Sequence, residues 1–169
     1  MQIELQIAIS DPAPVPDADA VTRWISRTLA LAGRADSQCS LCIRVVDGAE
    51  GQTLNRQYRG FDKPTNVLSF PALPHDGLPA VLPPELLAEL PLGDLVLCWP
   101  VIEAEAVAQG KRLEDHCAHL LVHGTLHLLG YDHEAPAAAA AMEALEVAVL
   151  AQFSIADPYL IHPSGEVVS

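Results

Sequence analysis

The chain has 169 residues, half of them apolar and 18% charged, which excludes a disordered chain and a coiled coil. The length predicts a single domain, residues 1–169, with one sizeable core. The formal charge of −13 argues against broad, non-specific adhesion to nucleic acid or anionic membranes. Seven of the nine basic side chains lie in residues 1–63, so we expect an anionic substrate to contact this part of the chain.

Targeting signals are not expected. The N-terminal segment MQIELQIAIS alternates polar and apolar residues without a basic leader, so we expect no signal peptide. No apolar run approaches the roughly 18 residues that span a bilayer. Four cysteines are too few for a disulfide scaffold. These features predict a protein of the reducing cytoplasm that does not enter a membrane.

The first third of the chain is predicted to alternate two strands with two helices. Apolar residues at every second position in 2–9 predict a half-buried strand, and a helix with an aspartate cap follows. Residues 39–46 predict a second strand. Asp47 and Glu50 resemble a capping box, which would begin a short helix over residues 47–59.

The rest of the chain is predicted to contain two strands and three helices. TNVLSF (65–70) and GDLVLCW (93–99) predict strands, joined by a long proline-rich loop with a helical turn near residues 85–90. A loose tail is expected from about residue 155. The three helices are predicted at residues 100–110, 112–129 and from Pro136 onward. The element order predicts an α+β fold with a mixed four-stranded sheet flanked by about five helices.

The segment HGTLHLLGYDH, residues 123–133, carries the strongest chemical signal. His123 and His127 lie four residues apart in a helical pattern, so both side chains project from one face. Gly130 allows the helix to end at positive φ, and the turn would bring His133 round as a third ligand. Three imidazoles leave a fourth position open, as in catalytic zinc sites. We therefore predict one zinc ion on these three histidines.

Other interpretations of the neighbouring residues stay open. The three histidines would be ordinary core or surface residues if they were close only by chance, but their spacing argues against this. His116 and His119 extend the same helical face upstream and are expected to flank the metal ligands. Asp132 is expected either to orient a ligand histidine or simply to lie in the turn.

The histidine spacing also matches the metzincin protease signature, H-E-x-x-H-x-x-G-x-x-H, with one departure. The first histidine is followed by Gly124, where those proteases have the glutamate that acts as general base. Peptide hydrolysis would lack a main catalytic group without it. A zincin-like scaffold is therefore favoured, and protease activity is not.

The histidine segment closely resembles the H-G-x-L-H-L-x-G-Y-D-H signature of the YbeY-type endoribonucleases, the bacterial rRNA maturation factors. The resemblance continues in LNRQYRGFDKPTNVLSF (54–70), GDLVLC (93–98) and MEALE (142–146), and covers most of residues 40–160 in the same order. It implies a zincin-like α+β fold and a single metal-dependent hydrolase domain. It also implies zinc bound by the three motif histidines and a functional role for Arg59.

The implied function is that of a single-strand-preferring endoribonuclease in the maturation of the small-subunit rRNA 3′ end and in ribosome quality control. Arg59 would stabilise the charge that develops on the phosphate, because a planar guanidinium can hold two oxygens. Arg56 and Lys63 lie in the same short segment and are predicted to bind the same anion. The attacking group would be either a water or a 2′-hydroxyl. Expected partners are RNA and, with it, the ribosome or ribosomal proteins.

Alternatives to these assignments stay open. Arg59 would be only a solvated cation if the helix dipole alone favoured it there. A metallopeptidase on the same scaffold is disfavoured by Gly124. A ribosome-assembly factor that keeps zinc for stability would be supported by a protein ligand in the fourth position.

Overall fold

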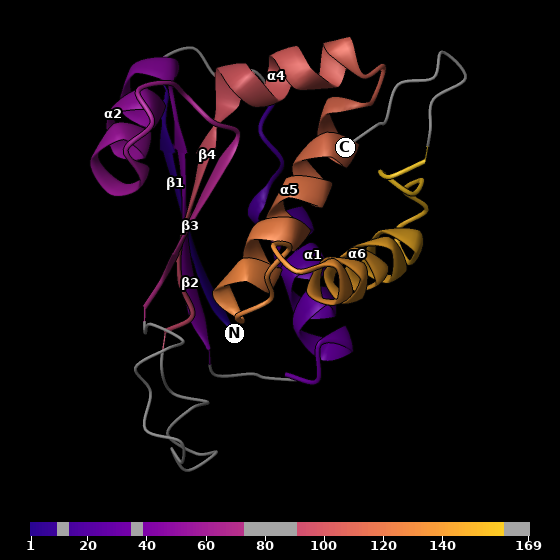
Figure 1. Cartoon of the computed structure of the whole chain (residues 1–169). Helices are drawn as coiled ribbons and strands as arrows, with labels where there is room; N and C mark the ends of the chain where they lie inside the picture. The colour runs from indigo at the N-terminus through magenta and orange to yellow at the C-terminus, as the bar shows by residue number, and fades with distance from the viewer. Residues whose placement is uncertain (10–13, 35–38, 73–90, 161–169) are drawn as a thin grey trace.

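Four strands form one mixed sheet in the spatial order β1-β2-β4-β3 (Figure 1). The computed structural model describes residues 1–9, 14–34, 39–72 and 91–160. Strands β1, β2 and β4 run parallel, and β3 pairs antiparallel with β4 at one edge. The strand bounds are Gln2–Ala8 for β1, Ser40–Val46 for β2, Val67–Pro71 for β3 and Gly93–Cys98 for β4.

Helices cover both faces of this sheet. Helix α2 lies on one face, whereas α1, α5 and α6 lie on the other, with α5 between the sheet and α6 (Figure 1). None of the helices in the described residues combines the length and apolar character needed to cross a membrane. The helix bounds are Ala18–Leu31 for α1, Gly48–Arg59 for α2, Trp99–Ala108 for α4, Leu113–Leu128 for α5 and Pro136–Ala151 for α6.

The predicted α+β class and the order of elements are confirmed over the described residues. The helical turn expected near residues 85–90 lies outside them. Residues 155–160, expected to be a loose tail, instead pack against the rest of the protein. Ile155 contacts the main core, and the Asp157 carboxylate accepts the backbone N–H of Tyr159 at 2.8 Å. Apolar side chains in this segment explain the difference, because they gain by leaving water.

The main core fills the space between the sheet and α1, α5 and α6. Helix α5 is buried on several sides, because it packs on the sheet, α1, α4 and α6 together. A smaller cluster of buried side chains lies on the opposite face, where Leu54 of α2 packs against it. The members of that cluster are Val46, Leu68, Val96 and Cys98.

The predicted capping box at the start of α2 is half right. The Asp47 carboxylate accepts the backbone N–H of Glu50 at 2.9 Å, as an N-cap should. Glu50 does not return the contact, because its carboxylate accepts two hydrogen bonds from Arg44 on β2, at 2.6 and 2.9 Å. A bidentate guanidinium–carboxylate pair is the stronger alternative for that side chain.

Gly124 allows α5 to lie directly on the sheet. A Cβ atom at this position would lie 2.9 Å from Leu95 Cδ2, 3.2 Å from Ser69 Oγ and 3.3 Å from Val67 Cγ2. Ser69 Oγ also donates a hydrogen bond to the Gly124 carbonyl at 3.2 Å. Side chains from β3 and β4 therefore occupy the space that any larger residue would need.

We predict that Gly124→Glu lowers the free energy of unfolding by about 3 kcal/mol or more, because it overpacks the interface and buries a carboxylate. Chemical denaturation measures the change. Gly48→Glu is the matched control, since nothing lies within 4 Å of a Cβ at Gly48 and a carboxylate suits the first turn of a helix. Equal stability of the two variants would contradict the packing argument.

Candidate metal centre and substrate groove

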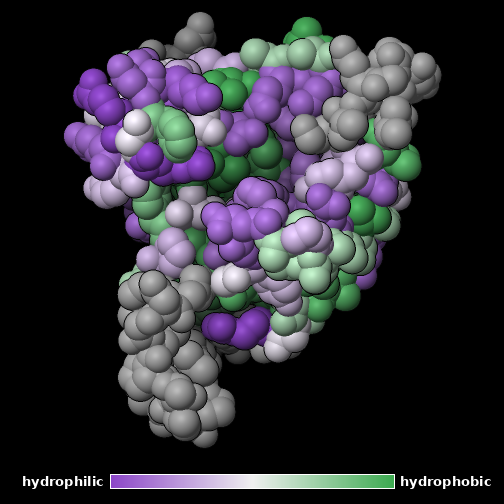
Figure 2. Space-filling view, viewed as in Figure 1, coloured by the Kyte–Doolittle hydropathy of each residue, from purple (hydrophilic) through white to green (hydrophobic). Residues whose placement is uncertain are grey.

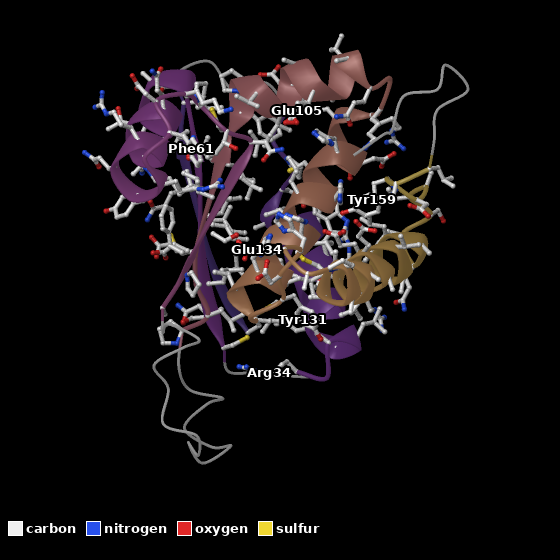
Figure 3. All side chains as sticks on the ribbon, viewed as in Figure 1. Arg34, Phe61, Glu105, Tyr131, Glu134 and Tyr159 are labelled. Atoms are coloured by element: carbon white, nitrogen blue, oxygen red, sulfur yellow. The ribbon has the colours of Figure 1, made fainter. Side chains whose placement is uncertain are left out.

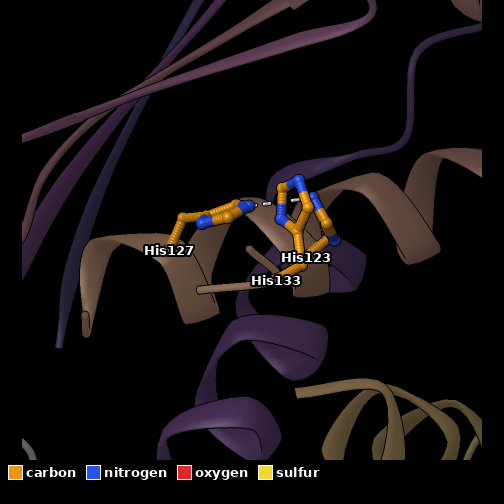
Figure 4. A group of neighbouring side chains, drawn as sticks. All are labelled: His123, His127 and His133. Carbon is orange, nitrogen blue, oxygen red and sulfur yellow. Dashed lines mark hydrogen bonds between the residues drawn. The ribbon is translucent and has the colours of Figure 1, made fainter. Parts of the chain in front are cut away.

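Three histidine rings converge at the end of α5. His123 and His127 project from the same face of the helix, and His133 comes from the loop that follows it (Figure 4). The rings of His127 and His133 lie 5.1 Å apart between centroids, and those of His123 and His127 lie 4.5 Å apart. Gly130 has a φ of +98° and permits the turn between helix and loop. One nitrogen from each ring lies within 4.8 Å of the others.

Hydrogen bonds to the outer nitrogens of His123 and His127 orient both rings toward the centre. His127 Nδ1 lies 3.0 Å from the Tyr131 carbonyl, which can only accept, so this nitrogen carries the proton. His123 Nδ1 lies 2.5 Å from a carboxylate oxygen of Glu146. With both rings neutral and protonated on Nδ1, the two Nε2 atoms, 3.0 Å apart, present a lone pair to each other. A cation between them relieves that repulsion, so the arrangement fits a metal ion such as zinc.

Glu146 is a fully buried carboxylate on α6 that connects His123 to the end of the described chain. Tyr159 donates its hydroxyl to the second carboxylate oxygen, and Tyr159 lies beside α6 in Figure 3. Burial raises the pKa of Glu146, but hydrogen bonds from His123 and Tyr159 outweigh it, so the pKa is lowered overall. Glu146 is thus held as an acceptor for the His123 N–H.

His116 and His119 flank the converging rings, as expected. His119 lies 3.9 Å from Glu146, and burial lowers its pKa to about 3, which keeps the ring neutral. His116 is buried 3.8 Å from Glu105. His119, His123 and Glu146 form a second group with metal-ligand spacing. In that group the Glu146 carboxylate already accepts the His123 N–H and the Tyr159 hydroxyl, so the group with His127 and His133 fits a metal better.

An open groove of about 560 Å³ runs from the three histidines to the end of α2. Figure 2 shows hydrophilic side chains over α2 and a hollow between them and α6. Arg59, the last residue of α2, lines this groove together with the three rings. Gly60 ends the helix at a φ of +77°, and Asn55 Nδ2 donates to the Lys63 carbonyl at 2.7 Å. These contacts hold the backbone on both sides of Arg59.

The other two predicted substrate-binding cations do not line the groove. Arg56 lies at the exposed end of α2, with Nη1 3.8 Å from the Asp62 carboxylate. Lys63 is exposed beyond the turn at Gly60. Its backbone carbonyl accepts the hydrogen bond from Asn55, and its side chain does not line the groove. Within the described chain no carboxylate pairs with Arg59. Arg59 therefore offers the groove an uncompensated positive charge.

Sequence reasoning missed Glu146 and Tyr159 as parts of the site. Asp132, considered as a possible partner for a ligand histidine, lies in the turn and accepts the backbone N–H of Glu134. A signal for Glu146 was present, because it shares the buried face of α6 with Met142 and Val149. A carboxylate on an apolar helix face needs a buried partner.

Comparisons with known proteins identify the family. The model of the family described as "Endoribonuclease YbeY" matches residues 7–154. A protein of that name from Alkalilimnicola ehrlichii is 52% identical over 94% of this chain and 91% of its own length. One from Halorhodospira halophila is 49% identical, with 94% and 97% covered. The chain therefore belongs to the YbeY family, as its histidine motif led us to expect.

A solved structure supports the same fold. The solution structure of a Thermotoga maritima protein matches with a TM-score of 0.55 and 20% identity. The match covers 90% of this chain and 92% of that one. At this identity the likeness concerns the arrangement of helices and strands alone.

We predict that Glu146→Gln weakens binding of a divalent metal ion about 10- to 100-fold, because the neutral amide orients His123 less well and lowers its basicity. Competition with a chromogenic chelator measures the affinity. Glu143→Gln removes an exposed carboxylate from the same helix, and the metal affinity of this control should stay within about twofold of wild type. Wild-type affinity in Glu146→Gln would show that the carboxylate does not support the ligand.

The buried, neutral His119 predicts a pH-dependent stability of the metal-free protein. Its folded-state pKa of about 3 lies below the ordinary 6.5, so the unfolded chain binds a proton first as pH falls. The free energy of unfolding should therefore fall by up to about 1.4 kcal/mol per pH unit below 6.5. Urea denaturation with chelator between pH 5 and 6.5 measures the slope. His119→Leu should flatten it, and an unchanged slope would contradict this origin.

Proposed function

We propose that the chain is a metal-dependent endoribonuclease that cleaves single-stranded RNA during maturation of the small-subunit rRNA 3′ end and in ribosome quality control. The observation that carries this proposal is the open groove, which has three converging imidazoles at one end and an unpaired arginine along its wall. The relatives are named as endoribonucleases, which supplies the class of reaction. A phosphodiester fits such a groove because it is an anion with two free oxygens.

The proposed cofactor is one zinc ion per chain, held by His123, His127 and His133. Three neutral imidazoles with an open side are the donor set of catalytic zinc sites, whereas structural sites are closed by a fourth protein ligand. When bound, zinc would supply Lewis acidity for the phosphate and for activation of the nucleophile. Glu146 holds the proton of His123 on Nδ1, and the Tyr131 carbonyl does the same for His127. Both Nε2 atoms are thereby kept available.

Arg59 is proposed to bind the scissile phosphate. Its guanidinium lines the groove that the histidines line, and no carboxylate of the described chain neutralises it. Negative charge on the phosphoryl oxygens grows toward the transition state, so a fixed cation stabilises that state more than the ground state. Arg56 and Lys63 would contribute to the approach of the RNA backbone from the exposed end of α2.

The metallopeptidase alternative is disfavoured by the packing of α5. The position that carries the general base in the metzincin signature is Gly124, and it faces Leu95, Ser69 and Val67. A glutamate there would have to displace these side chains, so the packing at this position disfavours it. The open groove likewise favours a reactive site over a zinc kept for stability alone.

The ribosome is the proposed setting for the reaction, in the cytoplasm. A chain with a formal charge of −13 gains little affinity for RNA from its overall field. Additional contacts with the ribosome or ribosomal proteins would supply the affinity that one groove arginine does not.

Cleavage of a single-stranded RNA by zinc-loaded protein tests the proposal. Arg59→Ala should retain zinc and stability but lose on the order of 2–4 kcal/mol of transition-state stabilisation, a rate drop of about 30- to 1000-fold. Arg59→Lys should recover only part of the rate, because a point charge holds two oxygens poorly. Arg27→Ala, which removes an exposed cation from α1, is the matched control and should cleave at the wild-type rate.

Two further outcomes decide between the alternatives. His123→Ala combined with His127→Ala should abolish both zinc binding and cleavage, and full zinc content in that variant would refute the ligand assignment. Metal-dependent hydrolysis of casein without RNA cleavage would favour the metallopeptidase. Zinc binding without either activity would favour the assembly factor.

A further inference from the structure

Two exposed aromatic rings flank Arg59. Tyr58 is 66% exposed and Phe61 is 51% exposed, and all eight aromatic residues of the chain lie in the described residues. Tyr58 and Phe61 are the only aromatic side chains among the large hydrophobic residues that the described structure exposes. Trp24 and Trp99, by contrast, are buried in the core. A largely exposed ring contributes less to folding than a buried one, and both of these rings lie beside Arg59.

Contacts order the Tyr58 ring in the groove and the Phe61 ring on Arg59. Tyr58 packs edge-on against Phe70 of β3, with ring centroids 5.0 Å apart and planes at 68°, and both residues line the groove. The Arg59 guanidinium carbon lies 5.5 Å from the centre of the Phe61 ring, within the range of a cation–π contact. Phe61 lies just beyond the end of α2, as Figure 3 shows. Arg59 therefore has one aromatic neighbour that lines the groove, Tyr58, and one in contact with its guanidinium, Phe61.

We infer that Tyr58 and Phe61 form a nucleobase-binding site, in which each ring stacks with an unpaired base next to the phosphate held by Arg59. This inference rests on the proposed function and adds how the groove recognises its substrate. Stacking of a base on an aromatic side chain contributes affinity without sequence preference, because every base has a π-face. A base must be unpaired and turned outward to reach such a ring. The site thus selects single strands over duplexes.

Charge and surroundings favour RNA over protein as the occupant. The residues next to the two rings in the sequence are exposed and polar; these are Arg56, Gln57, Arg59, Asp62 and Lys63. Protein-docking surfaces of monomers are larger continuous apolar areas. Alternation of aromatic rings with cations is typical of single-strand binding, where the cations contact phosphates and the rings contact bases. The chain is acidic overall, so base stacking would supply affinity that its charge does not.

Competition by non-cleavable oligonucleotides tests the inference on zinc-loaded protein. A 2′-O-methyl RNA oligomer and an abasic oligomer with the same phosphates compete with a cleavable RNA, and their inhibition constants are compared. Wild-type protein should prefer the base-bearing oligomer by about 5- to 150-fold per ring. Tyr58→Ala and Phe61→Ala should each lower the preference for the base-bearing oligomer by the share that one ring contributes. Their affinity for the abasic oligomer should stay at the wild-type value. Tyr58→Phe should keep the preference, because stacking needs the ring and not the hydroxyl.

A spectroscopic readout and a control keep the outcome specific. A 2-aminopurine base in the oligomer should be quenched on binding to the wild type and less so with Tyr58→Ala. Val107→Ala trims another highly exposed apolar side chain, on α4, and should change nothing. Equal affinity for base-bearing and abasic oligomers would overturn the inference. So would variants that bind RNA normally but no longer bind ribosomal protein.

The two proposals fail separately in these measurements. Cleavage by the wild type with no preference for bases would leave the endonuclease standing and remove the base site. Absence of cleavage would refute the proposed function, whereas a base preference could still be measured, because direct titration of the 2-aminopurine oligomer does not need cleavage.

Discussion

The close approach of α5 to the sheet is the constraint on which the rest of the site depends. Gly124 lies between His123 and His127 in the sequence, and a Cβ atom there would meet side chains of β3 and β4. A larger residue would push the helix outward and carry both imidazoles with it. The distance from α5 to β3 in turn sets the width of the groove, since residues of β3 form one of its walls. One small residue thus positions the imidazoles relative to the cation on α2.

Much of the fold could be predicted because its periodicities are strong. Alternating apolar residues marked β1, and glycines with positive φ marked the ends of α2 and α5. The spacing of His123, His127 and His133 predicted their convergence, because helix geometry and one turn determine it. The family resemblance pointed to Arg59 as a functional residue, and this residue lines the groove.

Other parts of the site depend on contacts between distant segments, which no local pattern describes. Glu146 contacts His123 across the α5–α6 interface. Glu50 accepts hydrogen bonds from Arg44 of β2 instead of accepting the backbone N–H at the start of its own helix. In both cases a charged partner brought close by the tertiary fold outweighs the local interaction. The packing of residues 155–160 was also not predictable from a local pattern. This short segment has no periodicity and contacts the core through single side chains such as Ile155.

The contact of Tyr159 with Glu146 has a consequence for the order in which the protein is made. Translation produces the chain from residue 1 onward, so the sheet and Arg59 emerge before the imidazoles of α5 do. Glu146 follows them, and its second oxygen receives the Tyr159 hydroxyl only when the segment beyond α6 has left the ribosome. Until then a buried carboxylate lacks one of its two donors. The site for the metal is therefore among the last parts of the molecule to be completed, and a nascent chain carries the groove before it carries a finished centre.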